Sequence, residues 1–554
     1  MLIRITTFVT AAFLAAVLTA GCDTPSSAPD PIMDGNGGSG GGGGGNTGGG
    51  GTVGGTCTSG SSSGTDAGSA TISGKVEYED KPFNKNGFTG AISNMPVRRA
   101  IVQAVDASGA ILVETETDAS GNYTVGFAYT SGAVCVRALT DGASPYAATV
   151  KDFRDDSIYA VISGDLAASL PGTLSNQNLL ADKDDVGQAF NIFDQMITTQ
   201  INLQTFSSAS LNQIDAYWHD GATDGTYYWP QSGVPSIFLL GTTSDSDTYD
   251  DTVILHELGH YAAASYSQDD SPGGPHALTG QYDLRLTWSE GWATFFGQLM
   301  RDIAGQSSPE VYVDTSSGGI TSFFFEIETP FPDGKGADNE VAVAAVLWDI
   351  YDLQNPPNAA YNDSDSLSLG YGEIWDIVDN RLPTFDVVTF EAFWDSWEAN
   401  VQSGQLAPPL TDRDIRYSAD VYEDNDDSTI NARTVTAGIS ENHTFFPAGD
   451  KDYVKINAAN GLTYTFVTDN LGDGADTLLT LYDSNGTTQL DQNDDDSSLD
   501  CTTGSAPSTI PCLASKITWT ANATKTVYLL VESYNQTSPI VSNYGYYTLS
   551  ISAQ

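Results

Sequence analysis

Two histidines four residues apart, with a glutamate beside the first, form the segment of this chain with the clearest chemical potential. They lie in His256-Glu-Leu-Gly-His260. On an α-helix, positions four apart differ by about 40° around the axis and about 6 Å along it, so both imidazoles can reach one metal ion. Nitrogen donors at this spacing suit zinc. Glu257 then points beside the ligands, where it can act as general base toward an activated water.

A catalytic zinc normally has three protein ligands and one open position, so a further ligand must come from elsewhere in the chain. Glu290 is the single acid of an otherwise apolar helical segment, 286–296. Because a buried carboxylate needs a partner, a metal ion is the best one available to Glu290. We therefore expect His256, His260 and Glu290 to bind zinc, with Glu257 as the catalytic base.

The residues around Glu290 carry a family resemblance. Ser289-Glu-Gly-Trp292 resembles the Glu-Gly-Trp of fungalysin-type peptidases, and segment 339–349 is similar to a later helix of the same group. The chain thus resembles the gluzincins, the thermolysin-like peptidases whose third zinc ligand is a glutamate on a second helix. The metzincin pattern is excluded because Ala263 and Tyr266 stand where that class has glycine and histidine. The gluzincin resemblance implies hydrolysis of peptide bonds.

The resemblance fails at two positions. Residues 333–338 contain no histidine, where the family has its transition-state histidine, and Thr294 replaces the aspartate that follows the glutamate ligand in thermolysin. An oxyanion donor must then come from other residues. The candidates are His276, in a Gly/Pro loop between the two ligand helices, and three tyrosines: Tyr249, Tyr261 and Tyr266.

The elements that position these residues follow from hydrophobic spacing. Apolar residues recur at three- and four-residue intervals in five segments, which predicts helices over 186–200, 251–264, 287–303, 340–351 and 389–401. Residues 236–240 read as a short strand. Together they predict a central α+β domain that spans 166–412.

Both flanks of this domain read as β-structure. Residues 71–165 hold short alternating runs between turn residues, and 117–125 resembles the closing hairpin of carboxypeptidase-regulatory, transthyretin-like domains. Residues 413–554 return to the same pattern, and motifs such as 423–426 and 449–453 resemble the bacterial pre-peptidase C-terminal domain. The expected fold is therefore multidomain: a central HExxH metallopeptidase flanked by two all-β sandwiches.

The N-terminus predicts export. Residues 1–21 form an apolar leader with one positive charge, and the residues before Cys22 resemble a bacterial lipoprotein signal, which implies a lipid anchor on Cys22. An ordinary secretory signal is the alternative. Residues 22–70 are rich in glycine and predict a flexible tether. An exported chain favours disulfides, and we expect Cys57 to pair with Cys135 and Cys501 with Cys512.

Acidic residues number 71 against 21 basic ones, which gives a net charge of −50. This balance excludes a nucleic-acid binder that relies on a basic surface. The acid runs 424–427 and 491–496 favour solvated turns, with calcium binding as the alternative, since 491–496 lacks the glycine and glutamate of an EF-hand.

These observations predict an exported, membrane-anchored zinc metalloendopeptidase acting on proteins or peptides, at the cell surface or released from it. Two other functions stay open. One is an aminopeptidase that uses the same zinc site, which needs an acidic anchor for the substrate amine. The other is a surface adhesion or binding lipoprotein whose central domain is inactive.

Overall fold

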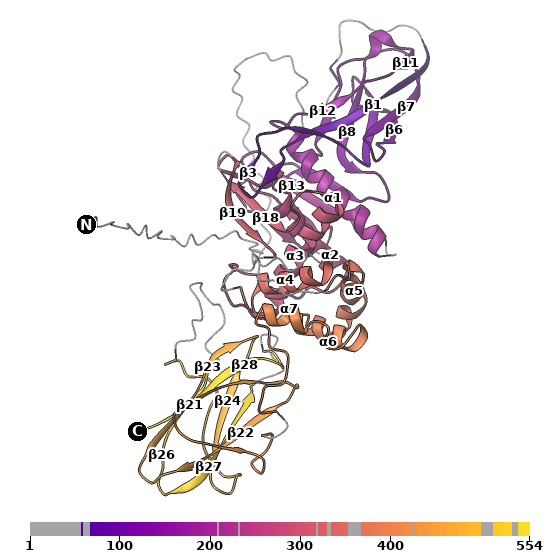
Figure 1. Cartoon of the computed structure of the whole chain (residues 1–554). Coiled ribbons are helices and arrows are strands. Elements are labelled where there is room, and N and C mark those ends of the chain that lie inside the picture. Colours follow the sequence, from indigo (N-terminus) through magenta and orange to yellow (C-terminus); the bar gives the residue numbers. More distant parts are fainter. Residues whose placement is uncertain are drawn as a thin grey trace, which may run out of the picture.

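The computed structural model describes residues 57–58, 67–207, 210–230, 233–316, 319–328, 334–352, 367–423, 426–499, 513–534 and 541–554. The chain is elongated, with β-rich parts at both ends and most of the helices between them (Figure 1). The leader 1–21, Cys22, nearly all of the tether and the Cys501–Cys512 pair lie outside the described residues.

The N-terminal part is organised around one long strand, β1 (Gly68–Asp80). Four shorter strands pair with it and form a five-stranded sheet. They are β4 (Ser93–Pro96), β7 (Asn122–Tyr129), β11 (Gly172–Leu174) and β12 (Leu179–Ala181).

An eight-stranded sheet continues from this part into the centre of the molecule. Its main order is β14-β15-β13-β9-β8-β5-β6, with β10 on β8. The strands are β5 (Ala100–Asp106), β6 (Ile111–Glu116), β8 (Val134–Gly142), β9 (Ala148–Asp152), β10 (Ala160–Ile162), β13 (Ile214–Trp218), β14 (Tyr227–Trp229) and β15 (Ser236–Phe238).

The border expected at 165/166 therefore does not separate two sheets. Strands β9 and β13 pair in parallel, with Ala148 opposite Ile214. Parallel neighbours need a crossover connection, usually a helix, and α1 (Gly187–Phe206) lies in the connection between them. One buried apolar cluster includes residues from β1, from α1 and from the central helices. The N-terminal and central parts thus share a core.

Each of the five segments with helical spacing forms a helix. Besides α1 these are α2 (Asp251–Tyr266), α3 (Leu284–Ile303), α4 (Glu340–Tyr351) and α6 (Phe390–Asn400). Two short helices, α5 (Tyr371–Asp376) and α7 (Ala407–Asp412), were not expected. Helix α3 lies between α2 and α4, and it packs on both.

A small antiparallel sheet joins the N-terminal part to the centre at a second place. Strands β2 (Phe83–Asn84) and β3 (Gly87–Phe88) form a hairpin, and β3 pairs with β19 (Ile320–Glu326), which pairs with β18 (Val311–Ser316). Two further short strands, β16 (Gly241–Thr242) and β17 (Asp245–Ser246), pair just before α2.

The C-terminal part consists of two antiparallel-rich sheets with one buried apolar cluster drawn from both. The first sheet contains β20 (Arg433–Val435), β22 (Lys451–Ala458), β24 (Thr477–Tyr482), β25 (Gln489–Asn493) and β27 (Lys525–Ser533). The second contains β21 (Ile439–Thr444), β23 (Thr463–Gly472), β26 (Lys516–Thr520) and β28 (Tyr546–Ala553).

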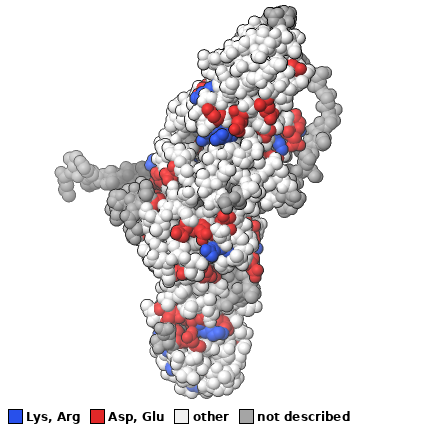
Figure 2. Space-filling view, turned by 90° about the vertical axis from the view of Figure 1, so that its right-hand side faces the viewer, with Lys and Arg blue, Asp and Glu red and all other residues white. Residues whose placement is uncertain are grey.

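The expected disulfide between Cys57 and Cys135 is present, with the two Cα atoms 5.5 Å apart. Figure 2 shows acidic side chains spread over one face of the molecule, with fewer basic ones among them. Within the described ranges, none of the helices has both the length and the apolar character needed to cross a bilayer.

Candidate metal centre

Helix α2 carries the two histidines on a buried segment. Asp250 occupies its N-cap position, but the Asp250 carboxylate accepts no hydrogen bond from the first turn of the helix. Both of its oxygens instead accept hydrogen bonds from Thr315 of β18, through the backbone N–H and the hydroxyl. Asp250 therefore fixes the start of α2 to the neighbouring strand.

Helix α3 approaches α2 closely enough to bring Glu290 to the histidines. The two helices meet at Gly259, where a Cβ atom would come within 2.6 Å of the Cα atom of Ala293. The indole N–H of Trp292 donates to the carbonyl of Gly259 at 3.0 Å, which fixes the contact further. A larger side chain at position 259 would push Glu290 away from the imidazoles.

The predicted ligand atoms converge. One nitrogen from each of His256 and His260 and one oxygen of Glu290 lie within 4.8 Å of one another. The Nε2 atoms of His256 and His260 are 3.1 Å and 3.4 Å from Oε2 of Glu290. Among the clusters of possible ligands in the described part of the chain, this one alone combines two imidazoles with a carboxylate.

Hydrogen bonds to the opposite ring nitrogens orient both imidazoles. Nδ1 of His256 lies 3.1 Å from Oγ1 of Thr294, and Nδ1 of His260 lies 3.1 Å from Oγ of Ser289. The Ser289 hydroxyl in turn donates to Asp269 at 2.9 Å. Such partners fix the tautomer of metal-binding histidines and direct Nε2 to the ion. Thr294, which departs from the thermolysin pattern, therefore supplies an orienting contact of its own.

The charge state of Glu290 suits a ligand. Burial opposes ionisation, but the neighbouring imidazoles of His276 and His260 more than offset it and hold the pKa of Glu290 well below its ordinary value. The carboxylate is therefore charged at neutral pH. Two imidazole nitrogens and one carboxylate oxygen match the donor set of catalytic zinc sites, so the residues fit that ion.

A cleft of about 90 Å³ opens beside the cluster. Glu257, His260 and Glu290 contribute to its wall, so the expected base and two of the expected ligands face the same space. Tyr228, on strand β14, also lines the cleft, and its ring centroid lies 6.3 Å from that of His260. The sequence pattern alone did not point to Tyr228. The aromatic run before Pro230 could have indicated an edge strand there.

His276 is the one expected oxyanion candidate that lies next to the cluster. Its Nδ1 atom is 2.7 Å from Oε2 of Glu340, and its Nε2 atom is 3.7 Å from Oε1 of Glu290. Burial lowers the pKa of His276, but Glu340 and Glu290 outweigh it and raise the pKa to about 10. His276 is therefore held between two carboxylates on two helices.

The three tyrosines proposed from the sequence are not brought to the cleft. The hydroxyl of Tyr249 donates to the carbonyls of Glu79 and Lys183, and that of Tyr261 donates to the carbonyl of Asn212. Tyr266 packs against Trp375. Within the described residues, none of the three contributes to the cleft wall.

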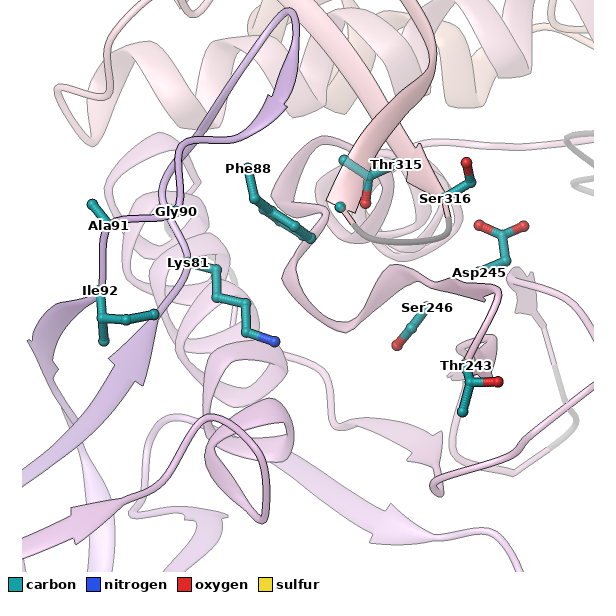
Figure 3. A pocket seen from close by; sticks show the side chains of 11 residues that line it. Lys81, Phe88, Gly90, Ala91, Ile92, Thr243, Asp245, Ser246, Thr315 and Ser316 are labelled. Carbon is teal, nitrogen blue, oxygen red and sulfur yellow. The ribbon is translucent and has the colours of Figure 1, made fainter.

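A larger cavity, of about 390 Å³, lies elsewhere, where the segment after β3 faces β17 and the end of β18. Figure 3 shows Lys81 and Phe88 on one side of it and Asp245 and Ser246 on the other. None of the expected site residues lines this cavity. It is therefore separate from the cleft beside His256, His260 and Glu290.

The acid runs weighed for calcium have different surroundings. In the C-terminal part Asp426 is buried, and nearby Asp420 and Asp452 flank His443, whose Nδ1 lies 3.3 Å and 3.0 Å from their carboxylates. Residues 491–496 are exposed or half-buried. Calcium binding at either place stays a prediction.

The comparisons with known proteins concern the same central region. A family model described as the mycolysin C-terminal domain matches residues 202–407, a segment that contains both histidines of the motif and Glu290. An uncharacterized protein of Archaeoglobus fulgidus is 31% identical over 177 residues, which cover 29% of this chain and 48% of that protein. The chain thus spans about half the length of this curated relative.

Several solved structures are each similar to about a fifth of the chain. The pre-peptidase C-terminal domain of a Bacillus anthracis collagenase is 14% identical, with a TM-score of 0.16, over 22% of this chain and 93% of that domain. PliG of Aeromonas hydrophila, a periplasmic lysozyme inhibitor, is 12% identical, with a TM-score of 0.16, over 22% and 97%. The family match associates the central region of this chain with peptidases.

Proposed function

We propose that the chain is a zinc-dependent metalloendopeptidase of gluzincin type. The convergence of His256, His260 and Glu290 within 4.8 Å carries the proposal. These three side chains would hold the ion, which as a Lewis acid lowers the pKa of water and polarises a carbonyl group. The orienting contacts from Thr294 and Ser289 support the same donor set.

The remaining steps fall to residues of the cleft. Glu257 takes a proton from the attacking water and passes it to the leaving amine, which splits the peptide bond. Tyr228, in the same cleft wall, would donate a hydrogen bond to the oxygen that gains charge at the scissile carbon. Both side chains line the same cleft.

An aminopeptidase would need a free acid to bind the substrate amine. Asp269 lines the cleft, but its carboxylate accepts from Ser289 and lies 3.9 Å from Nδ1 of His260. Asp269 therefore orients a ligand and is not available as an amine anchor, which favours the endopeptidase. Peptides with blocked and free N-termini separate the two activities, because only an endopeptidase cuts both.

We further propose that the protein is exported and anchored through Cys22, and that its substrates are proteins or peptides outside the cell. The leader 1–21 and the glycine-rich segment after Cys22 support this proposal. Labelling of cells with a fatty-acid analogue tests it, since Cys22→Ser should lose the label.

The decisive experiment compares the native protein with Glu257→Gln, Glu290→Gln and the surface control Glu373→Gln. We expect about one zinc in the native protein, retained without casein hydrolysis in Glu257→Gln and weakly bound in Glu290→Gln. The control should match the native protein. Metal analysis of the same samples measures calcium. Equal hydrolysis by all four proteins, or hydrolysis by none, would reject the function, and the latter would favour a binding lipoprotein.

A further inference from the structure

The C-terminal part reaches the candidate centre through one buried carboxylate. Asp473, in the loop after β23, is fully buried, and its Oδ1 accepts the backbone N–H of Ala337 at 2.7 Å. Its Oδ2 accepts the N–H of Arg416, also at 2.7 Å. Both carboxylate oxygens are thus used by backbone groups outside the C-terminal sheets.

Asp473 binds segment 336–340. This segment contacts both the loop that contains His276 and helix α3, which carries Glu290. The carbonyl of Ala337 accepts from the hydroxyl of Thr287 on α3, and the carbonyl of Asp338 accepts from the N–H of Tyr282. Asn339 caps α4, since its Oδ1 accepts the N–H groups of the first turn. Its amide group donates to the carbonyls of Leu278 and Gly280.

The path ends at the candidate ligands. Glu340, the first residue of α4, holds His276 at 2.7 Å, and His276 lies 3.7 Å from Glu290. Every connection from Asp473 to Glu290 is therefore a hydrogen bond, an ion pair or one step along the backbone. The loop of Asp473 also contacts α3 directly, because a Cβ atom on Gly474 would come within 2.9 Å of Leu284.

From this path we infer that Asp473 is a positioning residue for the candidate metal centre, so that the C-terminal part is needed for turnover. The inference rests on the proposed peptidase function for its rate measurements. Asp473 acts through segment 336–340, which sets the places of His276 and of helix α3. It touches neither the expected ligands nor the cleft.

The same interface offers a matched control. Glu391 of α6 accepts hydrogen bonds from Ser542 and Asn543 of the C-terminal part. It therefore joins the same two parts of the molecule without touching segment 336–340. Glu391→Gln should weaken the interface as Asp473→Asn does, but it should leave the path to Glu290 intact.

The test compares full-length Asp473→Asn with Glu391→Gln. Asparagine tolerates the positive φ of 55° at position 473, but it can accept only one of the two N–H groups. We expect Asp473→Asn to lower kcat about tenfold or more with KM nearly unchanged, because small misplacements at a reacting centre are costly. Glu391→Gln should keep the native kcat, even if it lowers the melting temperature by as much as Asp473→Asn does.

A second variant interrupts the same path at another residue, so that the test does not depend on the folding of Asp473→Asn alone. Asn339→Ser keeps a capping hydroxyl for α4 but cannot reach the carbonyls of Leu278 and Gly280, so it should reproduce the loss of kcat. Amide hydrogen exchange over 276–290 supplies a readout that needs no activity, and we expect faster exchange in Asp473→Asn than in Glu391→Gln. If the native protein hydrolyses no peptide, the peptidase function fails while the exchange data still decide the positioning role. Equal exchange in the two variants would overturn the inference.

Discussion

His276 and Glu340 form a close ion pair, with Nδ1 of the imidazole 2.7 Å from Oε2 of the carboxylate. The pair joins the loop between the two ligand helices to the first turn of α4. Because His276 also faces Glu290, it limits the positions that the expected third ligand can adopt. The structure thus gives this loop histidine a defined place, although the sequence alone left it as one of several candidates.

The orienting contact from Thr294 leads to a first prediction. Removal of this hydroxyl frees the His256 ring to rotate, and loss of such partners typically weakens metal binding about 10–100-fold. Thr294→Ala should therefore bind zinc more weakly, as measured by competition with a chromophoric chelator. Thr294→Ser keeps the hydroxyl and should restore the affinity. An unchanged zinc affinity in Thr294→Ala would contradict the orienting role.

A second prediction concerns the cleft wall. If the Tyr228 hydroxyl stabilises the developing oxyanion, Tyr228→Phe should lower kcat by about 10²–10³-fold with zinc content unchanged. Tyr217→Phe serves as the control, because this ring stacks on Phe238 but is not among the described residues that line the cleft. Steady-state kinetics on one fluorogenic peptide compares the two. Equal kcat values in both variants would assign the oxyanion contact to another group.

The C-terminal part leads to a prediction about pH. Burial lowers the pKa of His443, but Asp420 and Asp452 outweigh it and raise the pKa to about 10. A histidine with a raised pKa in the folded state stabilises that state fully below its unfolded pKa of about 6.5. The stabilisation is then lost between about pH 6.5 and pH 10.

His443→Gln should accordingly be least stable relative to the native protein below about pH 6.5. The gap should shrink by up to about 1.4 kcal/mol per pH unit as the pH rises toward 10. Denaturant unfolding at three pH values measures it. His219→Gln is the control, since Nδ1 of this half-buried histidine lies 2.9 Å from the backbone carbonyl of Asp220. A gap that stays constant across this range would rule out the charged pair.

The disulfide supports a fourth prediction. Cys57 and Cys135 are 78 residues apart in sequence, so their bond restricts a long loop in the unfolded chain. Replacement of both by serine should lower the free energy of unfolding by about 2–4 kcal/mol. Urea titration of oxidised native protein and the double variant provides the measurement. Coincident unfolding curves would show that the bond contributes nothing.

The sequence predicts the ligand helices well because their information is local. His256 and His260 share a face through helical geometry alone, and Glu290 stands out as the lone acid of its segment. The contacts of Tyr228 and Asp269 could not be predicted in this way, because tertiary packing brings them to the cleft. The sequence marks Glu340 only as the first residue of a predicted helix, because its pairing with His276 depends on two segments 64 residues apart.

The domain border was the least predictable feature of the fold. Composition changes near residue 165, yet strand pairing does not follow composition. Strand β9 pairs with β13, although the whole of α1 lies between them in the sequence. A parallel pair of this kind leaves no local signal, since neither strand carries a turn motif that points to the other.

The continuous sheet from β6 to β14 restricts how a substrate can enter the cleft. Two lobes joined by a single linker can move apart as rigid bodies. Here such a movement would break the backbone hydrogen bonds between β9 and β13. Asp269, Ser271 and Gly273, in the loop between α2 and α3, form part of the cleft wall, so a ligand would meet the cleft at this loop and not at a hinge between lobes.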